Sequence, residues 1–476
     1  MIEKKIKRGA AVLAAALALA GCADMSGIHS QSTLRDAQAF GLVAPAASAA
    51  PVNAEWWRDF GDQELNRLVA LALQGNPTLK LAQARLARAQ AVTEVANAAS
   101  LPQVNGSFDA TRQRYTANGA VPPPLAGSIR ESGTLQLSAS WELDFFGKNQ
   151  AALDAALDAA QAARADADAA RLLLASNVAR AYFQLARVNG QLAVAQRTLA
   201  QREESLRLIQ DRVRAGLDTQ LELRQGEGAL PEARQQIEAL QEQAALADHA
   251  LSALTGQGSQ PAVKSAPSLA TVHNLSIPAE LGADLLGQRA DIEAARWRVE
   301  AAGHEVKNAK AQFYPNVNLV AFAGLSSIGL GRLLDTGSQQ WGVGPAIRLP
   351  IFEAGRLRAN LRGKTADVDA AIESYNAAVL DAVRDTADQI ASSQSIARQQ
   401  SEQRTAQAAA EGAYEIALQR YKAGLGTYLN VLSAESAVLN QRRLAVDLAA
   451  RSLDTQVALV RALGGGYRAA PATLSN

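Results

Sequence analysis

Apolar residues recur at every seventh position along the stretch between Gly147 and Gly216, which is almost free of glycine and proline. One seam of this pattern consists of Val178, Leu185, Leu192, Leu199, Leu206 and Val213. The alternate seam consists of Leu174, Ala181, Val188, Ala195 and Ile209, with Arg202 as its one break. A sustained heptad predicts a helix that packs against neighbouring helices along its whole length. Such a helix would be on the order of 100 Å long.

A second copy of this stretch runs from Gly355 to Gly424, and one offset of 208 residues aligns both ends of the two copies without a gap. Charged residues between the seams exclude a helix that spans a bilayer. In the second copy the seam positions are polar or aromatic: Thr386, Ser393, Gln400, Gln407, Tyr414 and Tyr421. We interpret this face of the second helix as one that borders water, although ordinary divergence of a duplicated helix would give the same pattern.

Alternation of apolar and polar residues with a period of two precedes each long helix. In the first copy it runs over 104–115 and 135–143, with a loop rich in proline and glycine between the two runs. In the second copy it runs over 317–325 and 341–349, so Gly329-Leu330-Gly331 is a loop between strands and not a dinucleotide-binding fingerprint. Each pair of runs predicts a β-hairpin. Runs of about ten alternating residues are also the weak signature of outer-membrane barrel strands.

The order helix, helix, hairpin, long helix, turn and helix is therefore expected twice. The first repeat should open with helices over about 63–74 and 78–99, which Gly75-Asn76-Pro77 separates. The chain is expected to divide into a signal peptide at 1–21, a lipidated tether at 22–54, repeat one at 55–256, a connection at 257–284, repeat two at 285–466 and a C-terminal tail at 467–476.

The N-terminus has the pattern of a secretory signal peptide, with a basic start and an apolar run from Ala10 to Ala20. Its end, Leu19-Ala20-Gly21-Cys22, resembles the lipobox of bacterial lipoproteins. This resemblance implies that Cys22 is acylated, with palmitate among the attached chains, and becomes the new N-terminus. Ala23, where an aspartate would mark retention at the inner membrane, implies sorting to the outer membrane.

Composition excludes several classes of function. The formal net charge of the 476 residues is +1, which gives no sign of a nucleic-acid partner, and the single cysteine excludes an internal disulfide framework. The four histidines, His29, His249, His273 and His304, lack metal-ligand spacing, so no metal site is expected. The acidic run Asp154, Asp158, Asp166 and Asp168 is interpreted as a solvated helix face. No nucleophile elbow or paired-carboxylate context is present, so we expect neither an enzyme nor a cofactor beyond the lipid on Cys22.

Two hairpins supply four strands, which are too few to close a barrel. Open strand edges in lipid leave backbone groups unpaired at a cost of several kcal/mol each. A dimer would supply eight strands around an interior filled by side chains, whereas a trimer would supply twelve around an aqueous bore. The expected fold is therefore mixed α and β: a homotrimeric tube with a 12-stranded transmembrane β-barrel, continued by a long α-helical barrel and built from an internal duplication.

The chain resembles the outer membrane efflux lipoproteins, the TolC-like exit ducts of tripartite pumps. The resemblance rests on the lipobox, Trp56-Trp57 with Phe60, the segment from Leu349 to Arg356, and the paired tips at Gly216 and Gly424, and it covers about residues 55–466. It implies a passive duct in the outer membrane of a Gram-negative bacterium, with a large periplasmic part, that exports drugs or other toxic compounds. It also implies a homotrimer, a periplasmic adaptor (membrane fusion) protein and an inner-membrane transporter of the proton-driven RND type.

Within that resemblance the helix tips are the candidate adaptor-docking sites. The residues assigned to them are Arg212, Gly216, Leu217, Thr219, Arg420, Tyr421, Gly424, Leu425 and Thr427. Gly216 and Gly424 fit the left-handed end of a helix, and Thr219 and Thr427 fit N-caps of the returning helices. Some family members place acidic gate residues just after the second tip, where this chain has Asn430 and Ser433. The alternative gate residues are Glu411, Glu415, Arg420 and Lys422, with Arg420, Tyr421 and Lys422 as the candidate latch partners. Each of them also fits an ordinary solvated helix face.

Three other interpretations stay open at this point. A type I protein-secretion duct and a metal-efflux duct would share the same fold. An acylated periplasmic coiled-coil adaptor belongs to a different class, but it would have no use for four amphipathic strands. The sequence does not identify the exported compound.

Overall fold

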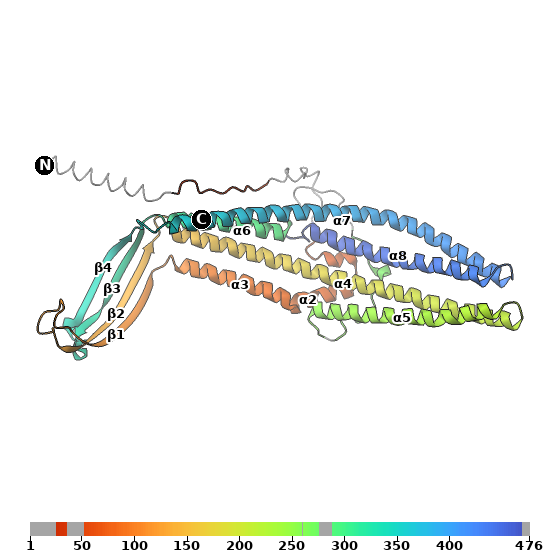
Figure 1. The fold of residues 1–476 in the computed structure, drawn as a ribbon, viewed down its shortest axis with the longest axis horizontal. Coiled ribbons are helices and arrows are strands. Elements are labelled where there is room, and N and C mark those ends of the chain that lie inside the picture. The colour runs from red at the N-terminus through yellow and green to blue at the C-terminus, as the bar shows by residue number, and fades with distance from the viewer. Residues whose placement is uncertain (1–24, 36–51, 259, 276–287, 469–476) are drawn as a thin grey trace. The chain divides into compact units, whose positions relative to one another are not determined.

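The computed structural model describes residues 25–35, 52–258, 260–275 and 288–468. From the helix before each hairpin onward, its main helices and strands follow the same order in the two repeats (Figure 1). The additional helix predicted at the start of the second repeat has no counterpart among the described residues, from which 276–287 are left out. The first repeat contains η2 (Trp56–Phe60), α2 (Gln63–Gly75), α3 (Pro77–Ala98), β1 (Gln103–Arg114), β2 (Ile129–Leu143), α4 (Lys148–Arg214) and α5 (Gln220–Thr255). The second contains α6 (Ala290–Ala311), β3 (Asn316–Ile328), β4 (Gln339–Arg348), α7 (Arg356–Lys422) and α8 (Tyr428–Ala462). Short turns η3 (Leu269–Thr271), η5 (Leu330–Arg332) and η6 (Thr336–Ser338) complete the described elements.

The two long helices confirm the duplication that the sequence predicts. α4 and α7 are each 67 residues long, and both end at the same point relative to the following glycine. The helices predicted over about 63–74 and 78–99 are confirmed as α2 and α3 within two residues at each end. No helix among the described residues combines the length and the apolar character that crossing a membrane would require.

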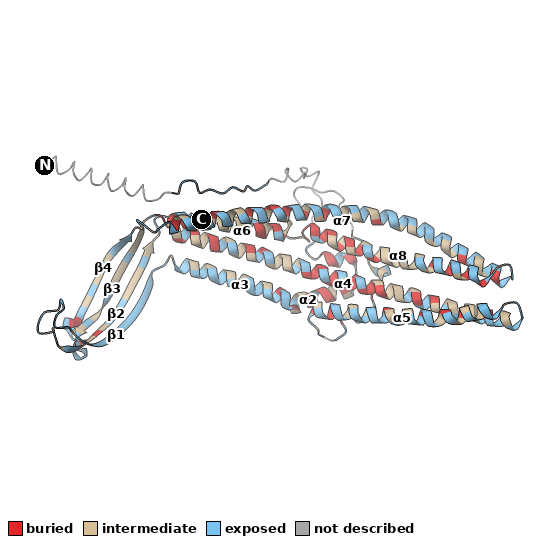
Figure 2. Cartoon of the chain, in the orientation of Figure 1, coloured by how far each residue is buried: buried red, intermediate tan, exposed pale blue. Residues whose placement is uncertain are grey.

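Four antiparallel strands form one sheet in the order β1-β2-β3-β4. The predicted hairpins are confirmed, and β2 also pairs with β3, so the two repeats share the sheet. The register aligns Phe108 with Leu135, Leu137 with Ala323, and Ala323 with Trp341, which brings the apolar positions of all four strands onto one face. Figure 2 shows that most of the strand surface is exposed.

Most residues on the other face of the sheet are polar, although Val320 and Phe322 of β3 also lie on it. Thr134 and Ser326 share a hydrogen bond of 3.2 Å between their hydroxyls, and the Gln340 amide donates to the Gln136 carbonyl oxygen at 3.2 Å. The opposite face carries large exposed apolar side chains, including Trp341 at 79% and Ile347 at 70% exposure. An exposed apolar face of this kind marks contact with a membrane or another protein.

The described residues fall into two compact units that cut across the repeats. Among the described residues, one unit comprises 25–34, 86–163 and 295–375, and it contains the sheet. The other comprises 35, 52–85, 164–258, 260–275, 288–294 and 376–468, and it contains the helix tips.

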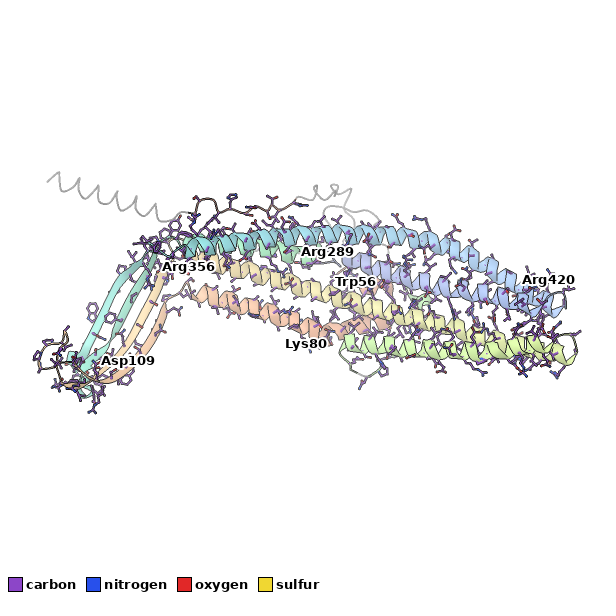
Figure 3. The ribbon with its side chains drawn as sticks, viewed as in Figure 1. Trp56, Lys80, Asp109, Arg289, Arg356 and Arg420 are labelled. Atoms are coloured by element: carbon purple, nitrogen blue, oxygen red, sulfur yellow. The ribbon has the colours of Figure 1, made fainter. Side chains whose placement is uncertain are left out.

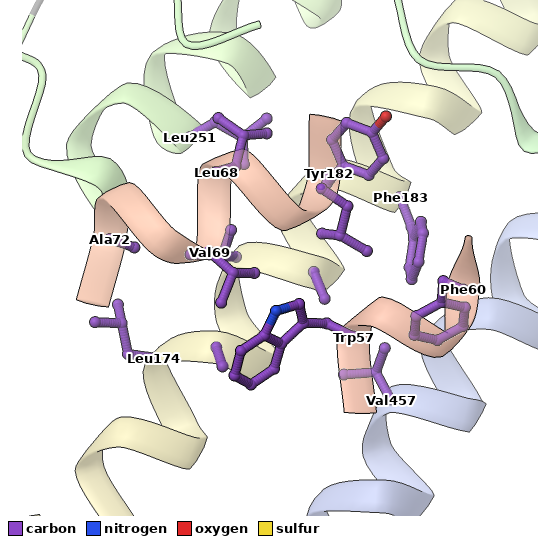
Figure 4. Packing of buried hydrophobic residues seen from close by; sticks show 14 of the residues in the cluster. Trp57, Phe60, Leu68, Val69, Ala72, Leu174, Tyr182, Phe183, Leu251 and Val457 are labelled. Atoms are coloured by element: carbon purple, nitrogen blue, oxygen red, sulfur yellow. The ribbon is translucent and has the colours of Figure 1, made fainter. Parts of the chain in front are cut away.

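The second unit has the larger apolar core. Figure 4 shows Trp57 and Phe60 packed with residues of α2, α4 and α8. Phe60 is fully buried, and its ring meets that of Phe183 edge-on at a centroid distance of 5.0 Å. Buried aromatic pairs with this geometry contribute beyond the area they bury, so the aromatic residues that open the first repeat anchor this unit.

Arg202, which interrupts the apolar heptad of α4, has an acidic partner on another helix. The Arg202 side chain is 11% exposed and makes an ion pair of 3.2 Å with Glu435 of α8, which is 9% exposed. Arg202 also donates to the Ala229 carbonyl at 3.0 Å and pairs with Glu232 of α5 at 3.1 Å. The seam position therefore holds a buried ionic connection between α4 and two other helices.

The interpretation of the second copy as a water-facing seam is wrong for three of its six positions. Thr386, Tyr414 and Tyr421 are buried, with exposed fractions of 4%, 8% and 1%. Tyr414 and Tyr421 belong to an apolar cluster with Ile209 of α4 and Val431 of α8. Polar seam residues also serve as donors, because Gln400 bonds the Leu448 carbonyl at 3.3 Å. A polar seam can therefore pack on neighbouring helices through aromatic rings and side chain to backbone bonds.

The acidic run on α4 is not a fully solvated face. Asp158 and Asp168 are half-buried, and burial raises the pKa of both carboxyls. His304 of α6 lies between Asp154 and Asp158, with ring nitrogen to carboxylate distances of 3.5 and 3.6 Å. Among the described residues no three histidine, cysteine or carboxylate side chains gather in a way that could hold a metal ion. The His304 ring thus makes a contact between α6 and α4.

Candidate functional site

The two helix tips have the same backbone. We call residues 211–222 the first tip and residues 419–430 the second tip. Gly216 and Gly424 adopt left-handed φ angles of 71° and 75°, which glycine accommodates without strain. The amide of Leu217 donates to the Arg212 carbonyl at 2.8 Å, and the amide of Leu425 donates to the Arg420 carbonyl at 2.8 Å. Both turns thus close by the same hydrogen bond, as the repeated glycine predicts.

The helices that leave the two tips are capped differently. The Thr219 hydroxyl accepts from the Leu221 amide at 3.1 Å, and the Glu222 carboxylate accepts from the Thr219 amide at 2.9 Å, which completes a capping box. Thr427 occupies the same position in the second tip, but its side chain makes no capping bond. The residue that corresponds to Glu222 is Asn430. Only the first tip therefore has a side-chain N-cap on the helix that follows it.

Asp218 connects the two repeats at the tips. It accepts two hydrogen bonds from the Arg212 guanidinium, at 2.9 and 3.2 Å, and a third from the Tyr421 hydroxyl. The guanidinium also lies over the Tyr421 ring, 4.7 Å from its centroid. The Arg212 and Asp218 side chains are only 12% and 9% exposed, so this pair is more than a solvent-screened surface contact.

The electrostatics of this cluster stabilise an ionised carboxylate. Burial alone would raise the pKa of Asp218, but the hydrogen bonds from Arg212 and Tyr421 outweigh burial and hold the pKa below its usual value. Burial and the adjacent carboxylate raise the pKa of the Tyr421 hydroxyl, which therefore remains a donor. Asp218 lies within the predicted tip but was not among the residues predicted to act there. The sequence contains one indication of its role: the equivalent position in the second tip is Gly426, so the carboxylate is present in one tip and absent from the other.

Exposed leucines project from both tips. Leu217 and Leu221 are 65% and 64% exposed in the first tip, and Leu425 and Leu429 are 70% and 61% exposed in the second. These leucines lie in or next to the two turns. Figure 3 labels Arg420, which lies near the end of α7 in the second tip. Leucines that remain this exposed at two matching turns fit a surface that a partner covers.

The four predicted gate residues do not form one cluster in a single chain. Glu411 accepts from Arg442 of α8 at 3.0 Å and from Gln407 at 3.2 Å, and these bonds hold its pKa below the usual value. Glu415, Arg420 and Lys422 are exposed. Arg420 reaches only the carbonyl of Leu425, at 3.4 Å. Sequence reasoning missed Arg442, whose role depends on the packing of α8 beside α7.

The predicted lipid site, Cys22, lies outside the described residues. Near it in the sequence, the described segment 25–35 runs beside α7. The Asp369 carboxylate accepts from the Ser30 hydroxyl at 2.6 Å and from the Gln31 amide at 2.9 Å. These bonds fix the segment that follows the predicted anchor onto the helix.

Comparison with known proteins gives consistent results. A family model described as outer membrane efflux protein matches residues 68–257 and 281–465. The chain is 40% identical over 374 residues to the fusaric acid resistance protein FusA of Burkholderia cepacia, an alignment that covers 75% of this chain and 69% of FusA. It is 33% identical over 468 residues to the putative multidrug resistance outer membrane protein MdtQ of Escherichia coli (strain K12), covering 95% of this chain and 96% of that protein.

A solved structure has the same fold. The outer membrane protein VceC from Vibrio cholerae superposes with a TM-score of 0.82 and is 37% identical in sequence. The superposition covers 88% of this chain and 100% of the VceC chain. The likeness therefore extends over the sheet and the long helices and is not confined to one repeat.

Proposed function

Because the chain belongs to the outer membrane efflux protein family, we propose that three copies of it close into the exit duct of a tripartite pump. As a member of this family the chain is an outer-membrane efflux duct. The proposal concerns what completes the duct: the number of subunits, the partners, the cargo and the gate.

The proposal of three subunits rests on the two edges of the sheet. Among the described residues β1 and β4 each pair along one edge only, and the apolar positions of all four strands face the same side. The β1 edge of one subunit can pair with the β4 edge of the next, which leaves no edge open to lipid. Twelve strands leave an aqueous bore, whereas eight strands fill their interior with side chains.

The tips support the proposal for the partners. Two turns with matching backbones and exposed leucines offer a docking surface for a periplasmic adaptor, which in turn would contact a proton-driven transporter of the RND type in the inner membrane. The duct itself needs no catalytic step and no cofactor. An acyl chain on Cys22 would add an anchor in the outer membrane.

The cargo is proposed to be small organic toxicants. The names of FusA and MdtQ associate those relatives with resistance to fusaric acid and to multiple drugs. For this chain we extend that class to fusaric acid and to other small organic toxicants, for which the fluorescent dye ethidium serves as a test compound.

The gate is proposed to lie at the tips and in the adjoining turns of α7 and α8, where each subunit has two side-chain locks. One lock consists of Arg212, Asp218 and Tyr421, and the other consists of Glu411 and Arg442. Both join separate helices by charge-assisted hydrogen bonds, so opening the duct would require these bonds to break or to move together as rigid pairs.

Export from cells tests the proposed cargo. Deletion of the chain from its host should increase the accumulation of ethidium and the sensitivity to fusaric acid, and expression of the wild-type chain should reverse both effects. A host in which deletion changes neither, although the chain is present in the outer membrane of the parent strain, would contradict the proposed cargo.

A further inference from the structure

The two ends of the sheet carry different side chains. At one end the strands lead into α4 and α7, and the connecting segments contain exposed aromatic residues, Phe145, Phe146 and Phe352. At the other end β1 joins β2 and β3 joins β4, and we call this end the loop end (Figure 1). There the apolar face of β1 continues into Arg112 and Arg114. The two ends therefore suit different surroundings.

The period of the strand places both arginines on the apolar face. Side chains alternate between the two faces of β1, so Phe108, Ala110, Arg112 and Arg114 follow one another on the same face. Side chains two positions apart lie about 7 Å from each other along a strand. At this spacing two guanidinium groups can donate hydrogen bonds to one phosphate group between them.

Neither arginine is neutralised by a buried partner. Arg112 lies 3.4 Å from a carboxylate oxygen of Glu131, but both side chains are exposed, and exposed pairs of this kind are held weakly. The Arg114 side chain is exposed and makes no ion pair or hydrogen bond with the part of the chain that the structure describes. Two guanidinium groups against one carboxylate leave these three residues with a net charge of +1.

Leucines of η5 lie on the apolar face beside the arginines. Gly133 of β2 pairs in register with Ala110, two positions before Arg112 on the same face. A Cβ atom at Gly133 would lie 2.8 Å from Leu330 Cδ2 and 3.2 Å from Leu333 Cδ2, so these side chains cover the glycine. Leu333 is buried, whereas Leu330 remains exposed. The loop end thus combines an exposed apolar side chain with two cationic groups.

This combination fits a lipid that bears phosphate. Arginine donates charge-assisted, bidentate hydrogen bonds to phosphate oxygens, while its aliphatic stem lies along apolar surface. The long helices of outer-membrane efflux channels are periplasmic, so the loop end is the end that reaches the outer leaflet. That leaflet of a Gram-negative outer membrane consists mainly of lipopolysaccharide, whose lipid A carries phosphate groups next to its acyl chains. Exposed aromatic residues at the opposite end suit the other membrane interface.

We propose that the apolar face of the sheet binds lipid A at the loop end, with Arg112 and Arg114 donating to its phosphate groups and Leu330 contacting its acyl chains. The proposal rests on the proposed function, because this face meets lipid only when the strands span the outer membrane. The site distinguishes lipid A from the same glycolipid without phosphate.

A matched pair of lipids tests this recognition. Native mass spectrometry of the detergent-solubilised full-length protein measures the binding of lipid A and of dephosphorylated lipid A at equal concentrations. EDTA is present, so no divalent cation bridges the phosphates to Glu131. We expect lipid A to bind more tightly, by about two- to fivefold for each arginine that contacts phosphate, and the difference to shrink as the ionic strength is raised.

Variants locate the site on one face of the sheet. Arg112→Gln with Arg114→Gln should abolish the preference for lipid A and leave the binding of the dephosphorylated lipid unchanged. Arg130→Gln is the matched control, because Arg130 is also exposed and pairs in register with Gln113 at the loop end, but on the polar face. It should leave the preference unchanged. The number of subunits in the same spectra shows whether each variant assembles.

Three results would overturn the proposal. The first is equal binding of lipid A and its dephosphorylated form, including no binding of either. The second is a loss of preference with Arg130→Gln equal to that of the double variant. The third is phosphatidylglycerol binding that depends on both arginines and is as tight as the binding of lipid A, since it would assign the site to any anionic lipid. Ion conductance of the same preparation in a planar bilayer reports separately on the duct, so a conducting assembly without a preference for lipid A contradicts only this inference.

Discussion

The Tyr421 hydroxyl, at the end of the long helix of the second repeat, donates to the Asp218 carboxylate in the turn of the first repeat. Asp218 is also held by Arg212, so one carboxylate joins three segments at the tips. The two halves of the duplicated chain are thereby connected by a side-chain contact that neither copy could make with itself, because the first copy has Val213 in place of Tyr421 and the second has Gly426 in place of Asp218.

Removing that hydroxyl should loosen the tips. Tyr421→Phe keeps the buried ring but deletes a hydrogen bond to a charged acceptor, at a cost of about 1.5–3 kcal/mol. We expect faster amide hydrogen exchange at the first tip and a higher conductance in a planar bilayer. Tyr428→Phe is the control, since its ring is also buried but its hydroxyl makes no hydrogen bond in the described structure. Equal effects of the two variants would argue against a specific lock.

Acid should weaken the same lock. The folded-state pKa of Asp218 is lowered, so the stability that the ionised carboxylate contributes is present above the ordinary aspartate pKa of 3.8 and is lost as the pH falls through the lowered value. Hydrogen exchange at residues 211–222 should therefore accelerate below about pH 4 relative to exchange in the core around Phe60. Asp218→Asn should exchange rapidly already at neutral pH and show a smaller step, because only the Glu222 carboxylate, whose pKa its hydrogen bonds with Thr219 also lower, would still act there. A step of unchanged size in Asp218→Asn would assign it to another group.

The caps of the two returning helices should respond differently to the same substitution. Thr219→Ala removes a side-chain cap and half of a capping box, which costs about 1 kcal/mol at the start of α5. Thr427→Ala removes a side chain that makes no capping bond, so the start of α8 should change little. Local hydrogen exchange of the first-turn amides measures both effects. Comparable acceleration of hydrogen exchange in the two variants would show that the Thr219 cap contributes no more stability than the Thr427 side chain.

The buried pair of Arg202 and Glu435 should show strong coupling. Arg202→Leu restores the apolar seam but leaves a carboxylate with 9% exposure without its nearest partner, and we expect a loss of about 3–5 kcal/mol. Replacing both residues with leucine removes the stranded charge and should recover most of that loss. Chemical unfolding of the solubilised protein measures the difference. A double variant as unstable as Arg202→Leu would mean that the loss of stability comes from poor packing of the leucine and not from the unpaired Glu435 charge.

Acylation can be tested separately from assembly. Cys22→Ser should abolish the incorporation of labelled palmitate while the strands and helices still assemble, since the described elements begin well beyond this position. Mass spectrometry of the mature N-terminus provides the readout. Lipid labelling that persists in the variant would exclude Cys22 as the anchor.

The sequence predicted those features that depend on local pattern. The heptad, the period-two runs and the glycines at 216 and 424 each specify a backbone conformation, and the repeats made each assignment twice. Pairing of β2 with β3 was not specified locally, because those strands belong to different repeats.

The features that the sequence did not predict depend on contacts between distant residues. Arg202 and Glu435 are 233 positions apart, and Tyr421 and Asp218 are 203 apart. A polar residue in a helical seam has the same pattern whether it faces water or a partner helix, so Thr386 and Tyr414 were assigned to the wrong environment. Comparison of the two copies was the one local signal that could have identified Asp218, because it shows which charges one tip has and the other lacks.

Native mass spectrometry combined with planar-bilayer recording of the same purified full-length protein tests the central claim most directly. We expect three chains in each particle and an ionic current that increases in Tyr421→Phe. A particle of one or two chains, or a trimer that inserts into lipid and carries no current even in Tyr421→Phe and Asp218→Asn, would contradict the account.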